Sequence, residues 1–312
     1  MSTRDLAVAA QPGPLRPRGE TRRWGEGLVK GILALCALVS VATTIAIVAA
    51  LLEPSIEFFR EVNLLDFATG TTWSPLFANG EFGVLPLVVG TLSVTAWACV
   101  VCMPFGLGAA IYLSEYARPR VRRTLKPALE VLAGIPTVVF GFFALTFFTP
   151  LLADVGIDVG TFNALSAGLV MGVMLIPTVT SISEDAMGAV PHDLRDGAYA
   201  LGASRLQVST RIVVPAAISG IVASYVLAIS RAIGETMIVL IAAGTLPQLT
   251  FDPREQIETM TAFIGATGIG DVPTGSIEYK TIFAVGLTLF AFTLVMNAFA
   301  IRLVRRYREV YE

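Results

Sequence analysis

Long apolar runs without a charged residue dominate the pattern of the chain. Five of them have the length of about 20 residues that a helix needs to cross a bilayer: 31–52, 82–114, 131–153, 159–183 and 281–301. A sixth run, 212–251, is interrupted only by Arg231 and Glu235. The pattern therefore predicts an all-α polytopic membrane protein with six transmembrane helices.

The basic residues predict the orientation of these spans, because cytoplasmic loops carry an excess of Lys and Arg. With the N-terminus inside, the outer segments hold only Arg60, Arg254 and Lys280 of the 22 Lys and Arg residues. Arg231 lies within a span, and all the others fall in inner segments. We therefore expect both termini in the cytoplasm and outer loops at 53–81 and 245–280.

The N-terminal segment 1–27 contains Pro, Gly and Arg without an apolar period, which predicts a disordered cytoplasmic tail. A cleaved signal peptide is the alternative, since a basic segment precedes an apolar one. The run 31–52 exceeds the 7–15 residues typical of a signal-peptide core. A retained first helix is therefore the better interpretation.

Composition narrows the function classes. Hydrophobic residues make up 54% and charged residues 15% of the chain, whereas an ordinary soluble domain carries about 25% charge. The 22 basic and 24 acidic residues nearly balance, which argues against a nucleic-acid-binding protein, since such proteins are strongly basic. Three Cys and one His predict neither a disulfide scaffold nor a metal site.

The cytoplasmic loop 184–211 has a distinctive pattern. Pro191 interrupts the chain, and His192-Asp193 offers an N-cap. Asp196 to Leu206 is expected to form a short helix with Gly202 at or near its end. Such a helix outside the bilayer can bind a partner protein, but an ordinary amphipathic connector explains the pattern equally well.

The same loop resembles the "EAA" loop of binding-protein-dependent ABC importer permeases, whose pattern is E-A-A-x-x-L-G-A-S and then I-x-L-P. The corresponding residues are Asp196, Gly197, Ala198, Leu201, Gly202, Ala203, Ser204 and Pro215. Asp196 and Gly197 replace the usual Glu and Ala, and Gly197 weakens a helix by up to about 1 kcal/mol. The resemblance implies that 191–210 is a coupling loop seated in a cleft of a cytoplasmic ATPase.

The resemblance also implies a domain organisation. Residues 28–83 would hold the first transmembrane helix and an outer loop. Residues 84–306 would form a type I permease core from helices two to six, and 307–312 a cytoplasmic C-terminus. The sequence contains no Gly-Lys dipeptide and hence no Walker A loop. We therefore expect a non-enzymatic chain without cofactors, with ATP and Mg²⁺ bound by a partner ATPase.

Arg231 and Glu235 are the only charged residues in the apolar spans. At a spacing of i and i+4 they would share one face of a single helix, with Arg231 about 24 Å from Pro215 at about 1.5 Å per residue. Ionisable side chains within a membrane mark functional sites by default. The two residues could line the substrate path, where the planar fork of Arg231 suits phosphate or sulfate. The structural alternative is an ion pair that neutralises itself.

Four stretches narrow the resemblance to phosphate-specific importer permeases of the PstC type: SRAIGETMIVLIAAG, and residues 71–92, 132–150 and 275–290. This resemblance implies a bacterial cytoplasmic-membrane location. The basic run from Arg118 to Lys126 could contact anionic membrane lipid, although the positive-inside bias alone also explains it. The resemblance also implies a second permease of the PstA type, an ATPase dimer and an extracytoplasmic phosphate-binding protein. A sulfate or molybdate permease is an alternative, as is an ATP-independent anion transporter. The last would need an internal repeat or several buried acidic residues.

Overall fold

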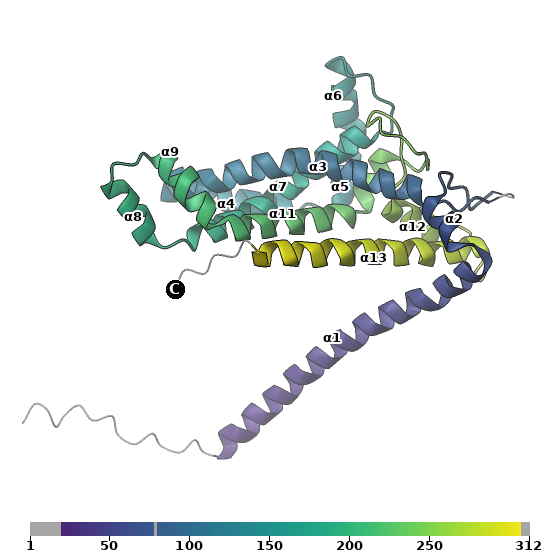
Figure 1. Ribbon diagram of the computed structural model, residues 1–312, viewed down its shortest axis with the longest axis horizontal. Helices are drawn as coiled ribbons and strands as arrows, with labels where there is room; N and C mark the ends of the chain where they lie inside the picture. Colours follow the sequence, from purple (N-terminus) through teal and green to yellow (C-terminus); the bar gives the residue numbers. More distant parts are fainter. Residues whose placement is uncertain (1–19, 78–79, 307–312) are drawn as a thin grey trace, which may run out of the picture. The chain divides into compact units, whose positions relative to one another are not determined.

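The computed structural model describes residues 20–77 and 80–306, and in this part of the chain the regular structure is helical apart from one isolated bridge between Trp73 and Phe82 (Figure 1). Five helical segments are long and apolar enough to cross a membrane, and a bent pair of helices makes a sixth. The predicted all-α polytopic fold with six spans is thereby confirmed.

The five continuous spans follow the predicted runs closely. They are α1 (Glu20–Glu61), α3 (Leu85–Ile111), the segment of α5 (Thr137–Phe143), η2 (Ala144–Phe148) and α6 (Thr149–Asp154), then α7 (Ala164–Gly188) and α13 (Ile277–Arg306). α1 begins at Glu20, inside the segment predicted as a tail, and residues 1–19 lie outside the described residues. The run 131–153 begins instead in a separate helix, α4 (Pro119–Ala133), because Gly134 and Pro136 end that helix before α5 starts.

The sixth span is not one straight helix. η3 (Ser209–Val213) and α10 (Val214–Ala216) lead into α11 (Ile218–Ile233) through a bend of 70°. Gly234 caps the end of α11, and a short π-helical turn, η4 (Val239–Ala243), follows. α11 has 16 residues, about 24 Å at 1.5 Å per residue, which is less than the bilayer core of about 30 Å.

Close packing of α3 against α7 forms the centre of the core (Figure 1). A Cβ on Gly168 of α7 would lie 2.6 Å from the Trp97 Cβ, and one on Gly172 would lie 2.7 Å from the Ala98 carbonyl oxygen. Glycine at these two positions therefore lets the helix backbones approach closely, as is common in membrane helix pairs.

The described residues up to Ala50 form one unit, and those from Leu51 on form a second. Within the first unit, nearly every side chain of α1 from Glu26 to Ala50 is exposed, although most are apolar. An apolar surface on all sides is typical of a membrane-spanning helix.

An aromatic cluster stabilises the end of the second unit where the predicted outer loops meet. Phe67 of α2 (Leu64–Thr69) contacts Trp73 edge to face, and Trp73 contacts Phe263 of α12 (Met260–Ile269) at a ring distance of 5.0 Å. Phe58 packs on Phe67 in the same manner. Such pairs stabilise by about 0.5–1.5 kcal/mol each beyond the burial of area.

Candidate functional site

The predicted coupling loop contains two short helices. α8 (His192–Ala200) follows directly on Pro191, and α9 (Arg205–Val208) begins after Ser204. The helix predicted at 196–206 therefore starts earlier than expected, at His192, because Pro191 itself occupies the N-cap position. It also ends earlier than expected, at Ala200. Gly202 has φ +81° just after the end of α8, where a glycine in the left-handed region commonly terminates a helix.

Backbone and side-chain caps fix the turn between these helices. The Gly202 amide donates to the Tyr199 carbonyl at 2.9 Å, and the Ala203 amide donates to the Ala198 carbonyl at 3.1 Å. Ser204 and Gln207 form a reciprocal capping box that begins α9. The turn is thus held in one conformation by its own sequence.

The predicted coupling residues divide between an inner and an outer face. Ala198 is buried with Val208 and Val213 in a local apolar core. The exposed residues are Asp196, Gly197, Leu201, Gly202, Ser204 and Pro215, while Ala203 is half-buried. Leu201 is 91% exposed, which is unusual for a leucine that ends a helix. The exposed residues of the motif are therefore accessible to a partner protein.

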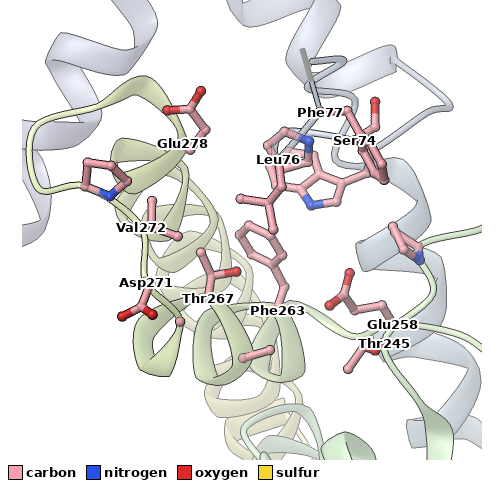
Figure 2. Close-up of a pocket in the computed structure, with 16 residues that line it drawn as sticks. Ser74, Leu76, Phe77, Thr245, Glu258, Phe263, Thr267, Asp271, Val272 and Glu278 are labelled. Carbon is pink, nitrogen blue, oxygen red and sulfur yellow. The ribbon is translucent and has the colours of Figure 1, made fainter. Parts of the chain in front are cut away.

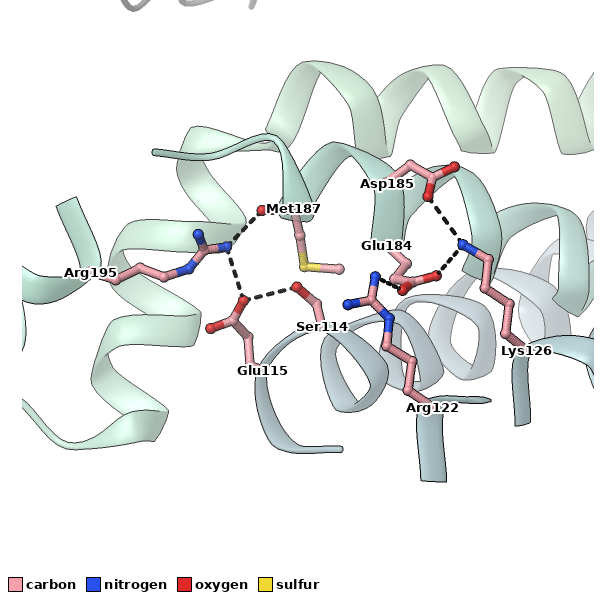
Figure 3. A network of polar contacts seen from close by, with 8 residues as sticks. All are labelled: Ser114, Glu115, Arg122, Lys126, Glu184, Asp185, Met187 and Arg195. Atoms are coloured by element: carbon pink, nitrogen blue, oxygen red, sulfur yellow. Dashed lines mark hydrogen bonds and ion pairs between the residues drawn. The ribbon is translucent and has the colours of Figure 1, made fainter. Parts of the chain in front are cut away.

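Arg195 holds the inner face of α8 (Figure 3). Its guanidinium donates to the backbone carbonyls of Met187 and Val190 at 2.7 Å each, and it pairs with the Glu115 carboxylate at 3.2 Å. Arg195 and Glu115 are both largely buried. Because Glu115 belongs to η1 (Tyr112–Tyr116) at the end of α3, this one side chain joins α8 to the ends of both α3 and α7.

A second buried carboxylate lies near the same end of α7 (Figure 3). Glu184 is 1% exposed and pairs with Arg122 and Lys126 of α4, the latter at 3.1 Å. Within the described residues its oxygens accept no aligned hydrogen bond, so the two cations supply its stabilisation. The adjacent Glu184 carboxylate is the main cause that raises the pKa of Lys126 above its ordinary value.

Sequence reasoning missed these anchoring residues. Arg195 shares the buried face of α8 with Ala198, three residues later, and that spacing was the available signal. The run from Arg118 to Lys126 was interpreted as an orientation signal or a lipid contact, and not as a partner of a buried carboxylate. Its pairing with Glu184 spans about sixty residues of sequence, so no local pattern could reveal it.

The structure places Arg231 and Glu235 on different segments. The prediction that they share one face of one helix is wrong, because α11 ends at Ile233 and Gly234 breaks the chain. Glu235 caps the next turn instead: its Oε1 accepts from the amides of Met237 and Ile238 at 3.0 and 3.3 Å.

Arg231 lies in the last turn of α11 with its side chain exposed. It donates to the Thr178 hydroxyl of α7 at 3.2 Å. Within residues 20–77 and 80–306, no carboxylate forms an ion pair with it. A cation at a helix C-terminus is favoured by the helix dipole, and its donors remain available to an anion.

Comparisons with known proteins find similarity along most of the chain. A family model described as binding-protein-dependent transport system inner membrane component matches residues 102–309. The probable ABC transporter permease protein YqgH of Bacillus subtilis (strain 168) is 36% identical over 289 residues, covering 92% of each chain. The phosphate transport system permease protein PstC 1 of Mycobacterium tuberculosis (strain ATCC 25618 / H37Rv) is 34% identical and covers 96% of each chain. PstC of Mesorhizobium japonicum is 31% identical, covering 75% of this chain and 76% of its own.

Solved structures share the fold at low identity. A chain of a bacterial alginate ABC transporter, in complex with an alginate pentasaccharide-bound periplasmic protein, aligns with a TM-score of 0.64 and 17% identity, covering 92% of this chain and 96% of its own. A chain of the MetNI methionine ABC transporter aligns with a TM-score of 0.54 and 18% identity, covering 73% and 95%.

Proposed function

This chain belongs to the family of binding-protein-dependent transport system inner membrane components, and from this premise we propose that it moves inorganic phosphate as a permease of the PstC type. Family membership makes it a membrane-spanning permease subunit of an ABC importer. Family membership does not identify the cargo, which we propose to be phosphate.

The observation that carries the proposal is the similarity to phosphate permeases over nearly the whole chain. The mycobacterial PstC 1 covers 96% of it, including the stretch Ser230 to Met237 around the exposed Arg231. Arginine matches the geometry of a phosphate oxygen pair through its planar donors. Since Glu235 is engaged by backbone amides, Arg231 would meet phosphate with its charge unneutralised.

The proposed transporter needs partners that this chain does not supply. A separate ATPase dimer would bind ATP and Mg²⁺, since the sequence has no Walker A loop. A second permease of the PstA type would complete the path beside Arg231, and an extracytoplasmic phosphate-binding protein would deliver the anion. The transporter would lie in the cytoplasmic membrane, with both ends of this chain inside.

In this account α8 transmits the motion of the ATPase to the spans. The exposed face with Asp196 and Leu201 would sit in the ATPase cleft. The buried face would pass the displacement through Arg195 to α3 and α7, whose ends it joins. Rigid-body transfer of this kind is a common route of conformational coupling.

ATP hydrolysis by the reconstituted complex tests the proposed cargo. The permeases, ATPase and binding protein would be placed in lipid nanodiscs, and hydrolysis measured with phosphate, sulfate or molybdate. The proposal predicts stimulation by phosphate alone. Equal stimulation by sulfate or molybdate would reassign the chain to another oxyanion, and uptake that persists without ATP in matching proteoliposomes would favour an ATP-independent transporter.

A further inference from the structure

A cavity of about 620 Å³ lies where the two predicted outer loops meet (Figure 2). Its walls come from the segment Trp73–Phe77, from α12 and the chain on either side of it, and from the start of α13. This volume is typical of sites for small organic molecules. The cavity is remote in sequence from the coupling loop, and neither Arg231 nor Glu235 lines it.

Aromatic residues give the cavity rigid walls. Trp73 and Phe263 both line it, and their rings meet edge to face at an interplanar angle of 87°. Trp73 is 2% exposed, and among the described residues its indole Nε1 has no hydrogen-bond partner. The indole nitrogen itself is closed off from solvent, so Trp73 contributes its ring, and not its donor, to the wall of the cavity.

A buried carboxylate lies in the same cavity (Figure 2). Glu258 is 5% exposed, and the described part of the chain provides its side chain with neither a hydrogen bond nor an ion pair. Its backbone is fixed, because a Cβ on Gly90 of α3 would lie only 2.3 Å from the Glu258 carbonyl oxygen. The Met260 amide also donates to the Thr91 hydroxyl at 3.0 Å. The carboxylate is therefore held in the cavity by the packing of its own main chain.

The charges around the cavity are all of one sign. Glu258, Asp271 and Glu278 line it, and the described lining residues include no Lys, Arg or His. The helices packed against Glu258, α3 and α12, carry no Asp, Glu, Lys, Arg or His at all. Asp271 and Glu278 are therefore the titratable groups that share the cavity with it.

We propose that this cavity binds an organic cation: a positively charged nitrogen on a compact apolar body. The charge would face Glu258, and the apolar body would contact the rings of Trp73 and Phe263. Aromatic faces and carboxylates together are the usual environment for such cations. This proposal is independent of phosphate as the cargo.

The titration of Glu258 gives the proposal a distinctive signature. Burial raises the pKa of its carboxyl to about 8, so the empty cavity holds a mostly neutral acid at pH 7. A cation binds the ionised form, so binding strengthens as the pH rises through that value. For a permanently charged ligand, the affinity is expected to increase about tenfold between pH 7 and pH 9.

Choline and its neutral isostere 3,3-dimethyl-1-butanol provide a matched pair of probes. Both carry a hydroxyl and a branched head, and only choline is charged. The full-length chain would be purified in detergent with Trp24 and Trp97 replaced by Phe, so that Trp73 is the remaining fluorophore. Choline is expected to change the fluorescence of Trp73 at a concentration about tenfold lower than the alcohol needs.

Two carboxyl variants control this titration. Glu258→Gln is expected to weaken choline binding about tenfold and to abolish its pH dependence. Glu255→Gln is the matched control, because Glu255 is exposed in the same loop and does not line the cavity. Equal affinities for choline and the alcohol would overturn the proposal, and so would an unchanged choline affinity in Glu258→Gln.

The assembled transporter distinguishes two sources of the cation. If a basic side chain of the docked binding protein fills the cavity, choline will raise the concentration of binding protein needed for half-maximal ATP hydrolysis. If a free organic cation fills it, that concentration will not change. Failure of the phosphate assay would leave the choline titration unaffected, so the two proposals can fail separately.

Discussion

Arg231 carries a charge that no carboxylate of the described residues neutralises. Its neighbour in sequence, Glu235, accepts two backbone amides at the start of the next turn. This separation removes the self-neutralising ion pair as an explanation of the two residues. It leaves Arg231 with one weak partner, the Thr178 hydroxyl.

Replacing Arg231 tests its role in the path. Arg231→Ala is expected to abolish phosphate uptake while the permease still assembles with its partners, since the side chain is exposed and removing it leaves no cavity. Arg231→Lys keeps the charge but loses the planar fork, so uptake should fall only in part. Uptake by both variants at the normal rate, measured with radiolabelled phosphate in proteoliposomes, would exclude Arg231 from the path.

Arg195 is the residue whose loss should separate ATP hydrolysis from transport. Arg195→Met leaves Glu115 buried without its cation, which costs about 3–5 kcal/mol. It also frees the carbonyls of Met187 and Val190. We expect ATP hydrolysis to continue in the complex while phosphate moved per ATP falls severalfold.

Arg120→Met is the control for this variant, because Arg120 is exposed on α4 and forms no ion pair with a described residue. It should leave the ratio of phosphate to ATP unchanged. Arg195→Lys keeps the charge and should restore part of the ratio. If Arg195→Met lowered hydrolysis and uptake equally, Arg195 would be a folding residue without a part in coupling.

At the scale of elements, α8 depends on two glycines with opposite roles. Gly202 has φ +81° with open space around a Cβ, and Gly197 lies in the helix, also with open space. Gly202→Ala is therefore expected to destabilise by about 1–2 kcal/mol through backbone strain alone. Gly197→Ala should stabilise by up to about 1 kcal/mol, since alanine favours a helix.

Thermal unfolding of the purified chain measures both variants. The expected shifts of the unfolding temperature have opposite signs, downward for Gly202→Ala and upward for Gly197→Ala. Shifts of the same sign would mean that the conformation of α8 described above is wrong. Gly197→Ala also restores the residue usual in the family pattern, so phosphate uptake should persist in it.

A comparison of the predicted spans with the observed helices shows which features a sequence pattern can predict. Apolar length and the absence of charge predicted the spans 82–114, 159–183 and 281–301 to within a few residues. The run 212–251 was equally apolar, but Pro215, Gly234 and Gly244 break it, and their effects depend on how the broken pieces pack. Local composition cannot distinguish one long helix from a bent helix followed by a turn.

In the candidate site, the sequence predicted those features that depend on residues close together in the chain. The capping residues of the coupling loop and the termination at Gly202 follow from short-range rules. Pairings over long sequence distances did not follow, as with Glu115 and Arg195 or Glu184 and Lys126. The cavity around Glu258 was missed for the same reason, since it joins two loops that are distant in sequence.

At the scale of the whole molecule, the proposed function makes this chain a permease whose spans carry the path and whose helix α8 receives the motion of an ATPase. Its central claim is that the cargo is phosphate. Family membership alone does not decide this, since the relatives include a permease named only as a probable ABC transporter component. The structural neighbours come from transporters of alginate and methionine.

Uptake of radiolabelled phosphate at limiting concentration tests this claim most directly. Cells with and without this chain would be compared, each with excess unlabelled sulfate or molybdate in parallel. The account predicts that uptake is lost without the chain and that neither competing anion reduces it when the chain is present. Equal phosphate uptake in both strains, or its suppression by sulfate or molybdate, would contradict the assignment of phosphate as the cargo.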